Sequence, residues 1–287
     1  MRPSDWDDPS VWPAPAKLNL GLRVVGRRSD GYHLLQTVFQ LLDFGDSLRF
    51  WPAESGAISV EPTLAGVSAI DDLCVRAARR LASHAGVATG VRIGRVKRIP
   101  LGGGLGGGSS NAATVLLALN RLWNLGLEID ELAQIGLGLG ADVPVFVRGC
   151  SAFAEGVGEQ LRPVRLAARW FAVFTPAVAV STGAVFADPQ LTRDAKPLKM
   201  RDFLRAGPEN GLESVVRRMA PEVSVLLDWL ATETADGGLT GSGSSVYAPC
   251  PSYAAGTALL ARCPLPVSAF VARGADRSAT LSRLDQA

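Results

Sequence analysis

The residues from Pro100 to Ala113, PLGGGLGGGSSNAA, point most directly to chemistry. Six of the seven residues from 102 to 108 are glycine. Ordering glycine costs roughly 1 kcal/mol more than ordering alanine in regular structure, so a folded protein concentrates it where bare backbone has a use. Successive N–H groups without Cβ atoms in the way can converge on an anion. The sequence therefore predicts a phosphate-binding loop.

The residues after the glycines predict a helix that begins at this loop. Ser109 or Ser110 is a suitable N-cap, and apolar residues recur at helical spacing through residues 110–123. The glycines would then lie at the positive end of the helix dipole, where an anion is stabilised.

Three other interpretations of the glycine run are weaker. A flexible linker is polar and lies between domains, whereas this run has apolar neighbours and Leu105 interrupts it. A Walker-type loop needs a lysine where Ser109 stands. A dinucleotide-binding G-x-G-x-x-G pattern fits any long glycine run, so its match carries little weight.

Two further segments carry the groups that phosphoryl transfer needs, an activated acceptor and a nearby cation. In PAKLNL (15–20), Lys17 and Asn19 share one side of a predicted strand and the apolar residues share the other. Asp142 lies in LGADVP, an apolar, glycine-bent loop. Taken singly, Lys17 also fits an ordinary exposed strand face, and Asp142 fits a turn residue that hydrogen-bonds its own backbone.

Five motifs in order along the chain resemble the GHMP kinase superfamily. They are PAKLNL, RSDGYH (28–33), the glycine loop, GADVPVF (140–146) and TGSGSS (240–245). The resemblance runs from about residue 13 to the 240s and covers nearly the whole chain. It implies an α+β, two-domain GHMP kinase fold with the active site in the interdomain cleft, an N-terminal ATP-binding domain at 1–163 and a C-terminal domain at 164–287.

Within the superfamily, RSDGYH together with PAKLNL and GADVPVF resembles the branch that acts on a cytidine diphosphate-linked methylerythritol. This implies ATP-dependent phosphorylation of the 2-hydroxyl of that small molecule, in non-mevalonate isoprenoid precursor biosynthesis. It also implies Mg²⁺ bound between the β and γ phosphates, with protein ligands that the motifs do not identify. Rival interpretations are a kinase of homoserine or mevalonate, and a catalytically silent nucleotide-binding protein of this fold. Because a silent protein would be expected to lose Lys17 or Asp142, we favour a kinase.

The resemblance also assigns roles to residues. Asp142 would be the general base or would orient the hydroxyl, and Lys17 would keep it ionised. ATP would contact Lys97, Pro100, Leu101, Gly102, Gly103, Gly104, Leu105, Gly106, Gly107, Gly108, Ser109 and Ser110. The cytidyl substrate would contact Asn19, Tyr32, His33, Thr182 and Phe186.

In this cytidine pocket, Tyr32 and Phe186 would sandwich the base and His33 would read its edge. Phe186 also fits a core position beside Val185. One departure from the family pattern is Asp72, where an asparagine usually precedes leucine. Either Asp72 replaces that adenosine contact, or the nucleotide rests mainly on Lys97 and the loop.

Composition limits the other classes of function. The chain has 287 residues, of which 47% are hydrophobic and 20% charged, so it can bury a full core. Its net charge of +2 gives no sign of nucleic-acid binding. The sequence contains no run of 18 apolar residues, so we expect no membrane span. The four cysteines are scattered and residues 1–8 contain no apolar stretch, so we expect a cytoplasmic protein. A basic cluster before the glycines is either a solvated edge or an attractor for a polyanion: Arg92, Arg95, Lys97 and Arg98.

The elements that would position these groups mix strands and helices without a regular βαβ alternation, which favours an α+β fold. Expected strands include 14–25, 46–51, 91–96, 143–147, 151–154 and 170–175. Expected helices include 71–86, 110–123 and 129–139, the last capped by Asp130, and further helices near 200–205, 209–218, 221–232 and 252–262. Residues 1–12 lie outside the resemblance and are expected to form a loose tail.

Overall fold

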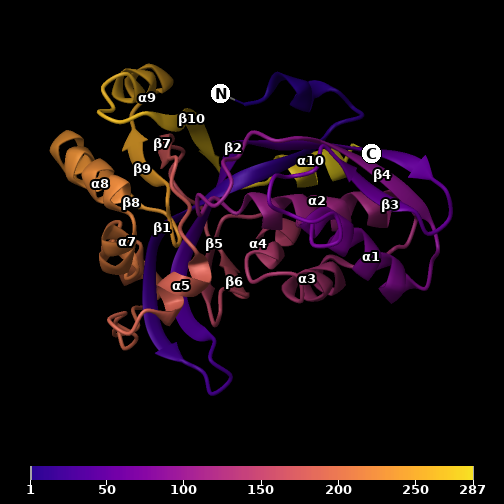
Figure 1. Cartoon of the computed structure of the whole chain (residues 1–287), viewed down its shortest axis with the longest axis horizontal. Coiled ribbons are helices and arrows are strands. Elements are labelled where there is room, and N and C mark those ends of the chain that lie inside the picture. The colour runs from indigo at the N-terminus through magenta and orange to yellow at the C-terminus, as the bar shows by residue number, and fades with distance from the viewer. Residues whose placement is uncertain (1, 287) are drawn as a thin grey trace.

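The computed structural model describes residues 2–286. Within them, a mixed sheet is covered by helices (Figure 1). The strands are β1 (Trp12–Arg27), β2 (His33–Ala53), β3 (Ile58–Glu61), β4 (Gly90–Val96), β5 (Ala152–Glu155), β6 (Gln160–Pro163), β7 (Trp170–Pro176), β8 (Gly238–Leu239), β9 (Val246–Cys250) and β10 (Val267–Ala275). The α-helices are α1 (Leu73–Ala85), α2 (Gly107–Leu122), α3 (Ile129–Leu137), α4 (Val143–Arg148), α5 (Thr182–Ala187), α6 (Met200–Phe203), α7 (Glu213–Met219), α8 (Pro221–Glu233), α9 (Tyr253–Leu260) and α10 (Ala279–Leu284).

The long antiparallel hairpin of β1 and β2 runs through the middle of the molecule (Figure 1). Strand β2 also pairs with β4, β5 and β10, so it holds together strands from distant parts of the sequence. As the sequence predicts, Lys17 and Asn19 share one face of β1, while Ala16 and Leu18 pack into an apolar cluster. This hairpin therefore carries Lys17 and Asn19 on a buried strand.

Helices α1 to α4 pack beside β1, β2 and β4 around one apolar core. Helix α1 shows how local sequence shapes this half. The Asp72 side chain accepts a hydrogen bond from the Cys74 N–H at the N-terminus of the helix, and Gly86 ends it in the left-handed conformation. Its apolar residues, Cys74, Val75, Ala77, Ala78 and Leu81, are buried. The observed helix agrees with the predicted 71–86.

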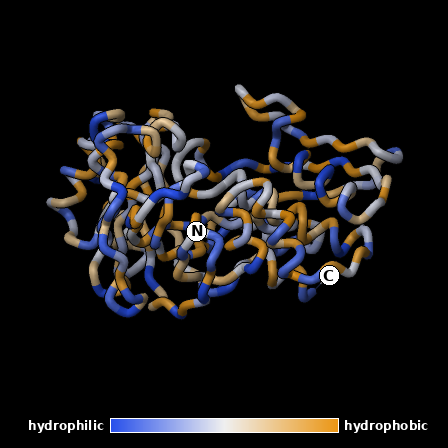
Figure 2. The backbone as a smooth tube through the Cα atoms, turned by 90° about the horizontal axis from the view of Figure 1, so that it is seen from below, coloured by the Kyte–Doolittle hydropathy of each residue, from blue (hydrophilic) through white to orange (hydrophobic). Residues whose placement is uncertain are grey.

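A second apolar core lies among β7, β9 and helices α7 to α9. Strand β10 pairs with β7 of this half and, through Gly274 and Ala275, with β2. Helix α10 then packs against β1 and α2. Figure 2 shows hydrophobic segments running through both halves, with hydrophilic stretches at many outer turns. The division at residues 163 and 164 stays a prediction.

The expectation of a loose N-terminal tail is wrong. Residues Ser4–Asp7 form a 3₁₀ helix, and Trp6 is 1% exposed. The Trp6 indole N–H donates to the Asp46 carbonyl oxygen at 3.2 Å, and Arg283 of α10 donates to the Trp6 carbonyl oxygen at 2.9 Å. These partners are distant in sequence, so the local composition of the segment could not indicate them.

Two local predictions are also wrong. Residues 143–147, expected as a strand, belong to helix α4, because a short apolar run has no periodicity that separates strand from helix. Pro144 stands in the first turn of this helix and Gly149 ends it in the left-handed conformation, as both residues favour. Asp130 does not cap α3, whose N-cap is Glu128 without a side-chain bond. Instead Asp130 accepts from Arg148 at 2.7 Å.

Among residues 2–286, no helix has the length and apolar character that crossing a membrane requires.

Candidate active site

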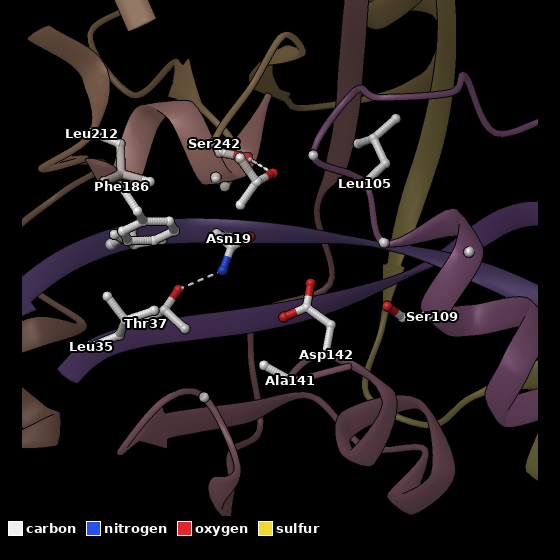
Figure 3. A pocket seen from close by; sticks show the side chains of 18 of the residues that line it. Asn19, Leu35, Thr37, Leu105, Ser109, Ala141, Asp142, Phe186, Leu212 and Ser242 are labelled. Carbon is white, nitrogen blue, oxygen red and sulfur yellow. Dashed lines mark hydrogen bonds between the residues drawn. The ribbon is translucent and has the colours of Figure 1, made fainter. Parts of the chain in front are cut away.

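A cavity of about 800 Å³ contains nearly all the residues that the sequence predicts for the site. Lining it are Lys17, Asn19, Tyr32, His33, Lys97, Pro100 to Ser109, Asp142, Thr182 and Phe186. Ser110 is the exception: it is fully buried in α2, outside the lining. Figure 3 shows Asn19, Asp142, Ser109 and Phe186 around this space.

The glycine loop leads directly into helix α2, as predicted, but neither serine caps that helix. Gly106 is the N-cap in the left-handed conformation, at a φ of 72°, and the helix begins at Gly107. Ser109 and Ser110 therefore lie within the first turn, where their side chains cannot act as the N-cap. Ser109 faces the cavity, and the Ser110 hydroxyl has no hydrogen-bond partner among the described residues.

The loop at 240–245 lies against the glycine loop and explains part of its composition. The N–H groups of Ser244 and Ser245 donate to the carbonyls of Gly102 and Gly103 at 3.3 and 3.2 Å. A Cβ on Gly104 would stand only 2.4 Å from the Thr240 carbonyl oxygen. The glycines thus allow one loop to pack closely on the other, in addition to leaving backbone free for an anion.

Lys17 is held among three oxygen atoms. Its ammonium group donates to Asn19 Oδ1 at 2.5 Å and to the Gly104 carbonyl at 2.9 Å, and it lies 3.3 Å from Asp142 Oδ2. The side chain is 3% exposed. This buried cation therefore joins β1, the glycine loop and the start of α4 at one point, and the interpretation of Lys17 as an ordinary exposed strand residue is wrong.

Asp142 is the more accessible member of the pair. Its side chain is 34% exposed and points into the cavity from the N-terminus of α4 (Figure 3). It makes no capping bond to the helix that follows. Its carboxylate is therefore available to an incoming hydroxyl group, with the Lys17 ammonium as its neighbour.

Asn19 links the site to the rest of the sheet. Its side-chain amide donates to Thr37 Oγ1 at 2.8 Å, and its backbone N–H donates to Thr240 Oγ1 at 2.8 Å. With Oδ1 bound to Lys17, both ends of the Asn19 side chain are engaged within the protein. Asn19 consequently orients Lys17 in this structure.

Lys97 is oriented by Asp46, a residue that sequence reasoning missed. Asp46 is 0% exposed and accepts from the Lys97 ammonium at 2.8 Å. Its other oxygen accepts from the N–H groups of Arg98 and Ile99 at 2.7 and 2.8 Å. Burial lowers the pKa of Lys97, and the Asp46 carboxylate opposes that shift. Asp46 thus shapes the segment that enters the glycine loop.

The predicted cytidine pocket is only partly assembled around its aromatic residues. Tyr32 is 63% exposed, and the ring against Phe186 is that of His33, with centroids 5.0 Å apart. Burial, followed by the positive charges of Arg193 and Arg27, lowers the pKa of His33. Phe186 is half-buried and lines the cavity, which places it at the boundary between core and site. Thr182 shares a hydrogen bond of 2.7 Å with Ser242.

Asp72, which stands where the family pattern has an asparagine, has a partner within the protein on each carboxylate oxygen. It lies outside the cavity lining and pairs with Arg95 at 2.8 Å, with both side chains almost fully buried. Its second oxygen accepts from Cys74, so the carboxylate is committed to structure. Arg98, from the same basic cluster as Arg95, pairs with Asp5 at 2.9 Å.

Several lining residues were missed because they carry no chemical signature in sequence. They include Leu22, Arg27, Leu35, Thr37, Phe39 and Leu212. Gly241 and Ser242 also line the cavity, and the TGSGSS motif pointed to their loop but not to their role. Apolar lining is assembled by the fold, so only the motif residues could be found in advance.

Comparison with known families identifies the family of this chain. The model of the GHMP kinases N terminal domain matches residues 72–150, and that of the GHMP kinases C terminal matches residues 196–264. The chain belongs to the GHMP kinase family, whose members are phosphotransferases that use ATP.

Relatives of one particular kinase within this family are similar to the chain over nearly its whole length. A 4-diphosphocytidyl-2-C-methyl-D-erythritol kinase of Chromohalobacter salexigens is 52% identical over 272 residues, which cover 93% of this chain and 91% of the relative. One of the same name from Nitrosococcus oceani is 49% identical over 276 residues, covering 96% and 98% of the two chains.

Solved structures agree with the fold. A 4-(cytidine 5'-diphospho)-2C-methyl-D-erythritol kinase is 35% identical, has a TM-score of 0.77 and is matched over 92% of this chain and 98% of its own. A mevalonate kinase with a TM-score of 0.66 is matched over 92% of this chain and 98% of its own. It is only 14% identical, so this match shows a common fold and nothing about the substrate.

Proposed function

We propose that this chain transfers the γ-phosphoryl group of ATP to the 2-hydroxyl group of 4-diphosphocytidyl-2-C-methyl-D-erythritol, a step of the non-mevalonate route to isoprenoid precursors. The observation that carries the proposal is the pair of Lys17 and Asp142, 3.3 Å apart in a cavity that also contains the glycine loop, Tyr32 and Phe186. Relatives named 4-diphosphocytidyl-2-C-methyl-D-erythritol kinase are identical to this chain at about half of the aligned residues, which supports the choice of substrate.

The acceptor hydroxyl would be activated at Asp142. Its carboxylate would accept the hydrogen bond of the 2-hydroxyl and take its proton as the oxygen attacks the γ-phosphorus. Lys17 would bring positive charge to the transferring group, whose negative charge is spread over its oxygens in the transition state. Because the Lys17 ammonium is fixed by Asn19 and Gly104, it needs little reorganisation during the reaction.

The nucleotide phosphates would rest on the glycine loop. The first N–H groups of a helix have no acceptor within that helix, and in α2 these belong to the residues that follow Gly106. They and the helix dipole favour an anion at this point. We propose further contacts from the Ser109 hydroxyl and from Lys97, which both line the cavity.

Cytidine would bind beside Tyr32, His33 and Phe186. Tyr32, exposed in this structure, would stack on the base opposite Phe186, and His33 would hydrogen-bond to its edge. Thr182 would contact the polar part of the substrate, and Asn19 would hold Lys17 while facing the same space.

Mg²⁺ would enter with ATP as part of the substrate. Among residues 2–286, no three His, Cys, Asp or Glu side chains lie close enough to hold a metal ion. Mg²⁺ keeps several waters and binds through phosphates with one or two protein oxygens, so the Ser109 hydroxyl, which lines the cavity, fits as a protein donor. The ion would neutralise charge on the β and γ phosphates.

Phosphorus NMR of the reaction product tests the proposed function. Purified enzyme incubated with ATP, Mg²⁺ and the cytidyl substrate should yield ADP and one new phosphomonoester signal. The phosphorus of that ester should couple to the carbon at the 2-position of the methylerythritol. A phosphate at another hydroxyl, or hydrolysis of ATP without a new ester, would contradict the proposal. We also propose a cytoplasmic location, supported by the four cysteines, which are free thiols.

A further inference from the structure

Arg193 lies in the segment after α5 and connects the parts of the proposed cytidine pocket. Its Nη2 group donates to the carbonyl oxygens of Phe186 and Asp188 at 3.0 and 2.7 Å, and Nη1 donates to that of Leu191 at 2.9 Å. Its Nε donates to His33 Nε2 at 3.0 Å, across to β2. One half-buried guanidinium therefore joins the C-terminal end of α5 to the imidazole that packs on Phe186.

The bond between Arg193 and His33 determines the chemical form of the imidazole. Every N–H of a guanidinium is a donor, and arginine stays protonated in proteins. His33 Nε2 must therefore accept with its lone pair, so it carries no proton. The single proton of the neutral ring is then on Nδ1, which has no partner among the described residues, while His33 lines the cavity.

The surroundings of His33 support the same form. The charged groups that face it are Arg193 and Arg27, both cationic, and both oppose a second proton on the ring. Arg27 donates to the Gly31 carbonyl at 3.2 Å, so it is held at the turn just before His33. The imidazole is 9% exposed, and burial acts in the same direction as the two charges.

We propose that Arg193 is a positioning residue that holds His33 neutral and protonated on Nδ1, so that His33 presents a fixed hydrogen-bond donor to the cytosine ring of the substrate. Cytosine offers acceptors at N3 and O2, which a fixed donor satisfies. The identity of the base as cytosine rests on the proposed function. The neutral, Nδ1-protonated form of His33 rests on its hydrogen bond with Arg193 and does not depend on that function. The same Arg193 guanidinium also positions the backbone of Phe186, because it donates to the Phe186 carbonyl oxygen.

Nitrogen NMR of the imidazoles tests the inference in the full-length protein. The chain has only two histidines, so a His84→Gln variant assigns their signals. Wild type should show His33 neutral with its proton on Nδ1 at pH 7 to 8, and charged only below pH 6.5. In Arg193→Met, that tautomer should be lost and the titration should move up toward pH 6.5, while the exposed His84 stays unchanged as an internal reference.

Kinetics give the second readout. In Arg193→Met, KM for the cytidyl substrate should rise about tenfold or more, as expected for a lost and misdirected hydrogen bond. The kcat value and the KM for ATP should stay within about threefold. Arg193→Lys keeps a cation that only donates, so it should retain the Nδ1 tautomer and recover part of the affinity. This variant also keeps the test decisive if the methionine variant does not fold.

Arg218→Met is the matched control. Arg218 donates to Asp188 Oδ1 at 3.0 Å, so it holds the same segment without touching His33. It should leave the His33 tautomer and the cytidyl KM unchanged. A wild-type His33 protonated on Nε2, or an Arg193→Met variant with the wild-type tautomer and titration, would overturn the inference. The NMR measurement needs no turnover of the cytidyl substrate. Failure of the inference about Arg193 and His33 is therefore distinguishable from failure of the proposed function.

Discussion

The Lys17 ammonium lies 3.3 Å from Asp142 Oδ2, and the two side chains differ sharply in exposure, 3% against 34%. The lysine is enclosed by Asn19 and the Gly104 carbonyl, whereas the carboxylate faces the cavity. The pair therefore combines a fixed cation with a group that a substrate can reach.

Asp142→Asn should remove the proton acceptor while leaving the shape of the site intact. We expect turnover to fall by about 10²- to 10⁴-fold, the usual contribution of a general base. ATP affinity, measured by equilibrium dialysis, should change little because the glycine loop is untouched. Turnover within tenfold of wild type would show that Asp142 is not the base.

Gly104→Ala should weaken ATP binding because its new Cβ meets the Thr240 carbonyl oxygen at 2.4 Å. We expect the KM for ATP to rise about tenfold or more as the loop shifts, and the thermal midpoint to fall. Gly102→Ala is the control. It has a similar φ of 68° but nothing within 4 Å of the Cβ, so it carries only the left-handed cost of about 1–2 kcal/mol. Equal effects from the two variants would exclude the contact between the loops as the cause.

Tyr32→Ala should affect only the cytidyl substrate. Tyr32 is 63% exposed, so its loss should not lower stability. Losing one stacking partner should raise the cytidyl KM about five- to hundredfold and leave the KM for ATP nearly unchanged. If both KM values rise together, Tyr32 does not belong to the cytidine pocket.

The lowered pKa of His33 makes stability depend on pH in a defined direction. The unfolded chain takes up the proton at about pH 6.5 and the folded protein only below it, so unfolding binds a proton between the two values. The contribution of His33 is therefore complete above pH 6.5 and is lost as the pH falls through the folded pKa. Urea unfolding of wild type and His33→Gln at pH 8 and 5 should show wild type losing more stability at low pH. An equal loss in both would contradict the shift.

Asp46→Asn should destabilise the protein and weaken ATP binding together. The buried carboxylate pairs with Lys97 and accepts from two backbone N–H groups, so removing its charge should cost about 3–5 kcal/mol. Asp130→Asn, in an exposed pair with Arg148, should stay within about 0.5 kcal/mol. Denaturant unfolding compares them, and comparable losses would argue against a structural role of Asp46.

The candidate site was predictable where its chemistry requires rare residue patterns. The glycine run by itself predicted a phosphate-binding loop at residues 100–109, whereas Lys17 and Asp142 were assigned because five ordered motifs together resemble the GHMP kinases; all of these residues line the cavity. Helices α1 and α2 were also predictable, because their apolar residues repeat at helical spacing.

The remainder depends on contacts between distant residues. Nothing near Trp6 indicates that Asp46 and Arg283 bury the N-terminal segment. Asp46 and Arg193 are ordinary charged residues in sequence and acquire their roles only through Lys97 and His33. For α4, the five apolar residues 143–147 fit a buried strand or a buried helix equally well.

The most direct test of the account is an ATP-consumption assay with Mg²⁺ in which the cytidyl substrate, homoserine and mevalonate are offered in parallel to the purified protein. The account predicts turnover with 4-diphosphocytidyl-2-C-methyl-D-erythritol alone, lowered by about 10²-fold or more in Asp142→Asn. Turnover of homoserine or mevalonate, or ATP binding without turnover of any of the three, would contradict it.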